Sequence, residues 1–435
     1  MSFTGVLKRI GQLILVPVVI SLIVFSLLAL SYLLPTEGMK EHTKAAFPIF
    51  DKEGYYYPQD GPKGTVRDNF IDAMYMNQAI VGAGDADLFG CVMSAYDWCW
   101  KDRAAQVENL EMAVKEPESV KLAITEDRFF NGHVIFVKLL LLLFDYNGIR
   151  VFNLTLIGLL TALLCWLMYR RGLGKYIPAV LVSIWFLRPV TVGLNMAFTG
   201  IYLCAVIPCI WMLAVRKETL EKYAWLFFVS AGSVMFCFNM NYFQLIGFGM
   251  MFLLVLLITG LPEKPGVLFR KLADLFIAWM IGYAGTMLLK WTLYQIFVDP
   301  TMFEAMIRHF LGRSDVDQSS RLGAVWFNTK IAFGSLWFWI PEVLFLAWTL
   351  WRRKKVGLKL FSFTPSEILL LAAMLLLPVG RLAILANHSY VHAWFTYRVL
   401  MLPVLACNFW FTGFGRQEIT GAQAPVAPAL AARSN

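Results

Sequence analysis

The sequence predicts an all-α membrane protein with about ten transmembrane helices and a large first extracytoplasmic loop. Three observations carry the prediction. Of the 435 residues, 59% are hydrophobic and 15% are charged, whereas a soluble domain has roughly 25% charged residues. Long apolar runs recur along the chain. Clusters of Lys and Arg occupy alternate connections between these runs.

Each expected spanning helix is an apolar run close to the ~20 residues that cross a bilayer. The first run follows a short basic start and is too long for a cleaved signal peptide, so we expect it to stay as a helix. The division between the fifth and sixth runs rests on only a few polar residues around Asn239 and Asn241. The ten runs are 11–34, 150–170, 176–194, 197–215, 223–239, 241–261, 271–297, 325–351, 366–385 and 394–413.

The basic residues set the expected orientation. Basic clusters occur at 8–9, 170–175, 216–222, 264–271 and 352–359, and the intervening connections are poor in them. Because cytoplasmic loops carry the excess of Lys and Arg, we expect both termini in the cytoplasm. The net charge of +9 is then explained by the basic residues of the cytoplasmic connections, and no nucleic-acid partner is expected.

This topology divides the chain into four parts. Residues 1–34 form the first transmembrane helix, and 35–149 form an extracytoplasmic loop with a juxtamembrane helix. Residues 150–413 form the transmembrane bundle, and 414–435 are an Ala/Pro-rich tail that we expect to be disordered in the cytoplasm. Within the outer loop, 66–80 and 104–124 have helical composition. The apolar run 133–144 is too short to span and predicts an interfacial helix.

The cysteines fall into two groups. Cys91 and Cys99 lie in the expected outer loop, where a disulfide between them is one of two open alternatives. The other five lie inside apolar runs, where buried, unreactive thiols are expected.

Asp68 and Asp72 are the candidate catalytic residues. They are four apart in the string V-R-D-N-F-I-D-A-M-Y-M-N, and so lie on one face of the expected helix. A carboxylate near the outer membrane surface can act as a general base that takes a proton from an acceptor hydroxyl. The alternative is an ordinary solvated helix with Asp68 as its N-cap.

Arg128, His133 and Lys138 form a second set, around the string R-F-F-N-G-H and the short apolar run. At the outer headgroup level, such cations could hold a lipid-linked phosphate. The alternative is interfacial anchoring by long side chains that reach the headgroups.

A third set lies in the string R-L-A-I-L-A-N-H-S-Y-V-H-A-W-F-T-Y-R. Ionisable residues at membrane depth are costly and therefore functional candidates. Anion binding is the favoured interpretation, because the histidine pair at four-residue spacing has no third zinc ligand nearby. The alternative is polar residues that cap two helices. The candidate residues are Arg381, His388, Tyr390, His392 and Arg398.

Three weaker signals lie elsewhere. Arg188 precedes Pro189 at the outer end of the third run, and Lys290 lies well inside an apolar run, where it needs a partner. Asp315 and Asp317 form a D-x-D pair in a loop polar enough to be mobile, but two residues are weak evidence for a metal–nucleotide site. No metal site and no cofactor are expected, although a divalent ion is not excluded.

The strings around Asp68, Arg128 and Arg398, together with L-F-D-Y-N-G-I-R, resemble segments of bacterial envelope proteins of the GT-C class of membrane glycosyltransferases. The architecture is similar over nearly the whole chain: one helix, a large outer loop with an early acidic residue, a juxtamembrane helix and many spanning helices. The resemblance implies a bacterial cytoplasmic (inner) membrane location, a sugar donor linked to polyprenyl phosphate and a general base at Asp68, with Asp72 its rival. The D-x-x-x-D spacing departs from the acidic pair or D-x-D common in the class, which leaves the base open.

The predicted function is therefore transfer of a sugar from a polyprenyl-phosphate carrier to a periplasmic or other extracytoplasmic acceptor, which is a glycan, a lipid-linked saccharide or a protein. Membrane lipid is the other expected partner. An oligosaccharide polymerase or ligase would place its largest outer loop late, whereas here it comes first. A transporter or flippase would show repeats or a path of charges through the bundle, and a purely structural protein would not need clustered polar residues on one face.

Overall fold

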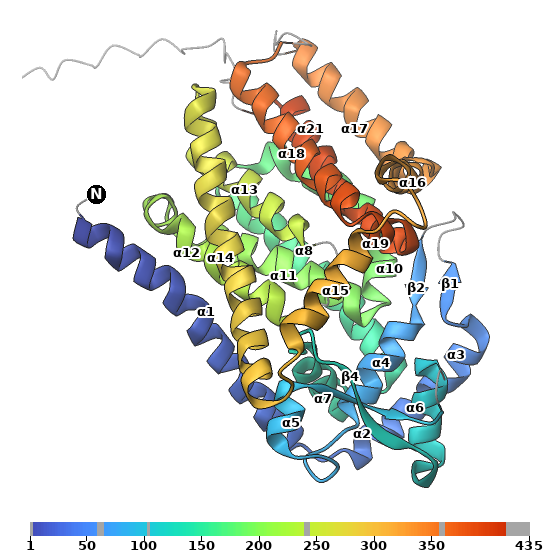
Figure 1. Cartoon of the computed structure of the whole chain (residues 1–435). Helices are drawn as coiled ribbons and strands as arrows, with labels where there is room; N and C mark the ends of the chain where they lie inside the picture. Colours follow the sequence, from blue (N-terminus) through green and yellow to red (C-terminus); the bar gives the residue numbers. More distant parts are fainter. Residues whose placement is uncertain (1–2, 59–64, 102–104, 239–243, 356–361, 415–435) are drawn as a thin grey trace, which may run out of the picture.

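In the computed structural model, the chain is described over residues 3–58, 65–101, 105–238, 244–355 and 362–414. Most residues of this part are helical, which confirms the all-α class (Figure 1). The described strands are four short segments in two antiparallel pairs: β1 (Tyr56–Pro58) with β2 (Val66–Asp68), and β3 (Ala95–Cys99) with β4 (Lys121–Glu126). The expected tail, 414–435, lies outside the described residues except for Phe414.

Five described helices are long and apolar enough to cross a membrane. Helices α16 (Arg321–Phe333) and α17 (Leu336–Lys355) meet at a bend of 70° and make a sixth if they count as one span. The described residues thus fit a membrane protein with five or six candidate spans, short of the ten expected. The five are the Gly11–Tyr32 part of α1 (Phe3–Tyr32), α8 (Tyr146–Arg170), α11 (Met196–Ala214), α14 (Pro265–Phe297) and α18 (Pro365–Ile384).

The remaining expected spans are shorter or broken. The third run divides at Leu187 and Arg188, the sixth run is a buried helix of 15 residues, and the last run is interrupted by 3₁₀ turns. Hydropathy cannot distinguish such a short, protein-enclosed helix from a full span, because both are apolar on every side. The elements are α9 (Ile177–Phe186), α10 (Pro189–Gly193), α12 (Lys217–Phe238), α13 (Leu245–Thr259), α20 (Ala393–Thr396) and α21 (Met401–Phe411).

Helices α12 and α14 pack backbone to backbone. A Cβ atom at Gly232 would overlap the Trp279 carbonyl, and one at Gly282 would overlap the Val229 carbonyl. Ser233 adds a hydrogen bond to the Gly282 carbonyl at 3.2 Å. Small residues that allow this approach are the usual means by which helices associate in lipid, where apolar surface alone gives no driving force between them.

The segment between α1 and α8 folds as a compact unit at the lower end of Figure 1. The expected interfacial helix is present as α7, whereas the helix expected over 104–124 ends at Lys115 and is followed by β4. Cys91 and Cys99 are both free. The helices of this unit are α2 (Glu37–Thr43), α3 (Phe47–Glu53), α4 (Asn69–Ala79), α5 (Leu88–Met93), α6 (Gln106–Lys115) and α7 (His133–Leu143).

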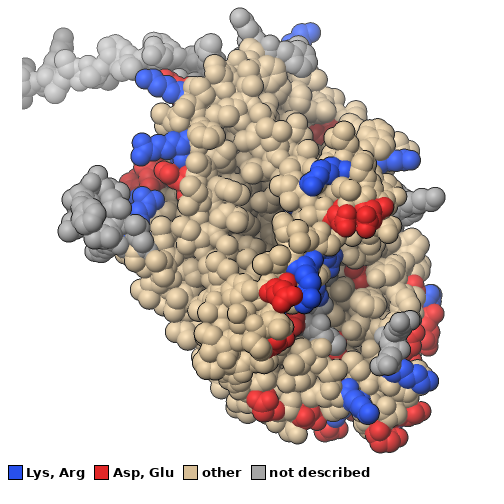
Figure 2. Space-filling view, viewed as in Figure 1, with Lys and Arg blue, Asp and Glu red and all other residues tan. Residues whose placement is uncertain are grey.

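The surface matches this division. In Figure 2, charged side chains lie at the upper left, along the right, at the lower end and in a group near the centre, whereas the middle left of this face is uncharged. Large apolar side chains of α1 and α14, such as Leu22, Leu30 and Ile277, are exposed in the described chain. Exposed apolar surface on this scale fits contact with lipid rather than water.

Candidate functional site

Asp68 lies where strand β2 ends and helix α4 begins. Its Oδ1 accepts a hydrogen bond from the Ile71 amide at 3.1 Å, so it is the helix N-cap. The residue is only 2% exposed, and its backbone carbonyl accepts from the Asn195 side-chain amide at 3.1 Å. Asp68 is therefore the helix N-cap, as one alternative predicted, but the helix is buried and not solvated as that alternative assumed.

Asp72, one helical turn later, is fully buried and bonded at both oxygens. Oδ2 accepts from the Tyr146 hydroxyl at 2.8 Å, and Oδ1 accepts from the Met196 amide at 2.9 Å. The Tyr146 hydroxyl in turn accepts from Arg150 at 2.9 Å, and Arg150 pairs with Glu53 at 2.9 Å. Asp72 thus ties α4 to α8 and α11 within a fixed polar network.

The two carboxyl groups differ in what remains available at their oxygens. Among the described residues, the second oxygen of Asp68 has one hydrogen-bond partner, the Trp394 indole N–H at 3.5 Å, which is long for a hydrogen bond. Burial raises the pKa of Asp68 to about 7, against the opposing effects of the Ile71 amide, Trp394 and Arg398. Burial likewise raises the pKa of Asp72 to about 7. A pKa near 7 suits a general base at neutral pH, and of the two carboxyls Asp68 is the one with an oxygen that makes no short hydrogen bond among the described residues.

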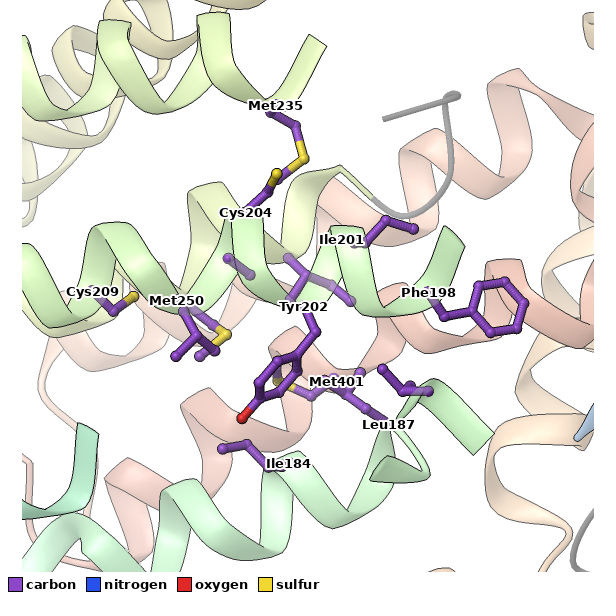
Figure 3. Close-up of a cluster of buried hydrophobic side chains, with 14 of the residues drawn as sticks. Ile184, Leu187, Phe198, Ile201, Tyr202, Cys204, Cys209, Met235, Met250 and Met401 are labelled. Carbon is purple, nitrogen blue, oxygen red and sulfur yellow. The ribbon is translucent and has the colours of Figure 1, made fainter. Parts of the chain in front are cut away.

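Arg398 supports Asp68 from the C-terminal part of the chain. Its Nε donates to the Leu187 carbonyl at 3.0 Å and its Nη1 donates to the Trp394 carbonyl at 2.9 Å. The guanidinium lies over the Phe198 ring at 4.6 Å. Phe198 and Leu187 belong to the buried apolar cluster in Figure 3, which anchors this side of the site in the bundle.

A second group of polar residues gathers around helix α15 (Met302–Ser314) and helix α19 (Ala386–Val391). We call it the Arg–His cluster; its members are Arg128, His309, Arg313, His388 and His392. Arg128 Nη1 lies 2.8 Å from both ring nitrogens of His309, and Arg313 Nε lies 3.2 Å from His309 Nε2. Arg313 also contacts His388 Nδ1, and the rings of His388 and His392 are 4.9 Å apart.

The Arg–His cluster borders a cavity of about 540 Å³. Burial lowers the pKa of His309 to about 4, and the nearby charges of Arg128 and Arg313 lower it further. Burial and Arg313 together lower the pKa of His392 to about 4. The histidines are therefore neutral at pH 7, and the arginines supply the positive potential that favours an anion. The cavity is lined by Ala305, Arg308, His309, Gly312, Arg313 and Asn387.

Trp394 connects the carboxylate to the Arg–His cluster. Its indole N–H points at Asp68, and its ring lies 5.1 Å from the ring of His392 and 5.1 Å from that of Tyr56. Residues separated by more than 300 positions therefore form one continuous polar region.

No family model, curated protein or solved structure matches this chain. Any function must accordingly be argued from the chemistry of this region.

Three predicted site residues make other contacts. His133 Nε2 bonds to the Gln78 side-chain oxygen at 2.8 Å, and its ring stacks on Tyr75. Lys138 is fully buried and donates to the Ala79 and Val81 carbonyls at 2.8 and 2.6 Å, which satisfies the end of α4. Tyr390 packs on Phe327 at 5.0 Å. Their described contacts are those of structural residues rather than of the cluster.

Arg381 stands near the cluster, since its charge helps to lower the pKa of His388. His309 and Arg313 are central to the cluster, although their segment was predicted from the sequence to be a mobile loop. Their four-residue spacing, which places both on one face of a helix, is the signal that could have found them. Lys290, whose need for a partner was expected, donates to the Met93 carbonyl.

The described residues contain no group of three or more His, Cys, Asp or Glu that could hold a metal ion. Asp315 bonds the following amide of Val316 at 2.6 Å, as expected of a turn residue. The pair of His388 and His392 lies against Arg313 and Phe395 rather than a third ligand.

Proposed function

We propose that this chain is a membrane glycosyltransferase that moves a sugar from a polyprenyl-phosphate carrier to an extracytoplasmic acceptor. The observation that carries the proposal is that Trp394 joins the buried carboxyl of Asp68, one oxygen of which has only a 3.5 Å hydrogen bond, to His392 of the Arg–His cluster. That cluster borders a cavity with two arginines in its wall. The proposal includes the orientation argued from the basic connections, with this region on the outer face of a bacterial cytoplasmic membrane.

The chemistry follows from the two halves of the site. The acceptor hydroxyl oxygen attacks the anomeric carbon of the sugar, and its proton passes to the carboxylate of Asp68. The bond from the anomeric carbon to the carrier phosphate breaks, and the electron pair leaves with the phosphate. Arg128 and Arg313 then face the negative charge that grows on the leaving phosphate, and cations held in place beside the reacting group stabilise such charge.

Asp68 is the proposed base and Asp72 its support. Asp72 already accepts two hydrogen bonds at 2.8 and 2.9 Å, so protonating it during reaction would break a network that holds three helices together. Asp68 instead gives up only the 3.5 Å contact with Trp394. A hydrogen bond of that length is weak, so the indole can move aside at small cost.

The carrier lipid of the purified protein tests the proposal. The protein is extracted in mild detergent, and its bound lipid is identified by mass spectrometry with and without added polyprenyl phosphate. We expect wild-type protein to retain a polyprenyl phosphate, bare or carrying a sugar, and the Arg313→Gln variant to lose most of it. Recovery of bulk phospholipid alone, with no retention of added polyprenyl phosphate, would sink the donor assignment.

A further inference from the structure

A second, smaller cavity lies where helix α9 breaks before α10, against the start of α17. Its volume is about 200 Å³, below the roughly 300–1,000 Å³ typical of sites that enclose a whole drug-sized ligand. Trp185 Nε1 donates to the Trp337 carbonyl at 2.7 Å and so joins the two walls. We call this the Trp–Arg pocket; it is lined by Trp185, Arg188, Pro189, Val190 and Trp337.

Among the described residues that line the Trp–Arg pocket, Arg188 is the only charged one. The residue is 6% exposed, and no hydrogen bond or ion pair joins its guanidinium to another residue in the described part of the chain. An arginine cannot shed its charge, and an unpaired buried charge is costly. A guanidinium that lines a cavity in this state is suited to a ligand with negatively charged oxygens, and its flat fork matches a phosphate with two parallel hydrogen bonds.

The local chain conformation fixes the position of Arg188. Its φ of 62° and ψ of 70° are left-handed, and Pro189 follows directly. A residue before proline is disfavoured in the helical region, so α9 ends before Arg188, and the left-handed conformation is one that a residue with a side chain seldom adopts. The break therefore sets the guanidinium in the pocket wall instead of continuing the helix.

The rest of the pocket wall is apolar and open to the outside. Val190 is 44% exposed and Trp337 is 54% exposed. In a helix bundle that crosses a membrane, such side chains face lipid, and Trp is enriched where lipid headgroups meet the hydrocarbon. A soluble anion would gain nothing from these surfaces, whereas an amphiphile would cover them with its apolar chain.

We propose that the Trp–Arg pocket binds the phosphate headgroup of a membrane amphiphile, with Arg188 as its anion ligand and Trp337 beside its chain. The pocket is fixed close to Asp68: the Leu187 carbonyl, just before Arg188, accepts from Arg398, and Asn195 donates to the Asp68 carbonyl. If the transfer reaction proposed above is correct, the amphiphile is the acceptor, which would then be lipid-linked. That assignment rests on the proposed function, but binding at Arg188 does not.

Binding stoichiometry separates the two sites. Native mass spectrometry in detergent would count bound farnesyl phosphate on wild type, Arg188→Gln, Arg313→Gln and the control Arg216→Gln, an equal charge change at an exposed arginine. Farnesol tests the need for phosphate, inorganic phosphate tests the need for the chain, and didecanoyl phosphatidate distinguishes an isoprenoid from a diacyl source. Arg188→Lys and Trp337→Ala test the same pocket by milder changes, in case Arg188→Gln fails to fold; the Trp337 side chain is half-exposed. Size-exclusion chromatography checks the folding of every variant.

The expected result is two bound farnesyl phosphates on wild type and on Arg216→Gln. Arg188→Gln and Arg313→Gln should each bind one. Arg188→Lys should keep the second molecule with an affinity lowered about tenfold, because charge remains and the fork is lost. Two bound molecules on Arg188→Gln, or equal binding of farnesol, would overturn this pocket assignment and leave the donor site standing. Loss only at Arg188→Gln, with Arg313→Gln unaffected, would support this pocket and count against the donor site. Equal binding of inorganic phosphate would also contradict an amphiphile site.

Discussion

Replacement of Arg313 by glutamine is the most informative change to the Arg–His cluster. Arg313 contacts both His309 and His388, so its loss removes the charge between the two histidines and releases both rings. A fixed donor that faces developing charge is worth about 3–4 kcal/mol, and Arg313 is partly exposed, so we take the lower value. A loss of ~3 kcal/mol in transition-state stabilisation is roughly a 150-fold fall in kcat/KM.

The assay measures transfer of labelled sugar from a polyprenyl phosphate to endogenous acceptors in an envelope extract, with purified protein in liposomes. Arg313→Lys should recover part of the activity, since charge is kept but the fork is lost. Arg216→Gln should behave as wild type. Thermal unfolding should shift little, because Arg313 lies near the end of a short helix. Full activity in Arg313→Gln would refute a role for the cluster in binding the leaving phosphate.

Three further predictions concern pH and folding. Asp68→Asn should gain stability relative to wild type by a few kcal/mol as pH rises from about 4 to about 7. In this range the Asp68 carboxyl keeps its proton in the folded wild type but loses it in the unfolded chain, so the wild type is destabilised and the variant is not. A difference in denaturation midpoint that does not change with pH would contradict the raised pKa. The transfer rate of wild type should rise as pH passes upward through about 7, because the base must lose its proton, and a rate that falls over this range would exclude a carboxylate base. Lys138→Met should lower the free energy of unfolding by about 2–4 kcal/mol by leaving two buried carbonyls unbonded, while transfer per folded molecule stays unchanged; loss of activity without loss of stability would instead place Lys138 in the site.

The sequence predicted the parts of the fold that depend on composition. The all-α class, the first long helix, the short apolar helix before α8 and the N-cap at Asp68 follow from local patterns of apolar and capping residues. The number of candidate spans did not follow, because α13 is enclosed by protein and reads as a span by hydropathy alone. The break at Arg188 was visible as a residue before proline, but its depth in the bundle was not.

The site was predicted in part. Asp68 was singled out by its four-residue spacing from Asp72, and His388 and His392 as ionisable residues beside apolar runs. His309 and Arg313 were missed because their segment lacks the apolar contrast that marked the other sets, and only tertiary packing brings α15 against α19. His133 and Lys138 were predicted as headgroup ligands, but they make structural contacts. The local sequence cannot distinguish a buried cation that caps a helix from an exposed cation that meets lipid headgroups.

The central claim is that Asp68 takes the proton of the acceptor hydroxyl during transfer of sugar from a polyprenyl phosphate. The most direct measurement is the liposome transfer assay with wild type, Asp68→Asn and a control, Asp51→Asn, which makes the same change at an exposed residue of α3. We predict that Asp51→Asn transfers like wild type, and that Asp68→Asn falls by 10²–10⁴-fold, as expected when a general base is lost, yet still retains polyprenyl phosphate. Undiminished transfer by Asp68→Asn, with the protein folded and its carrier bound, would contradict the account.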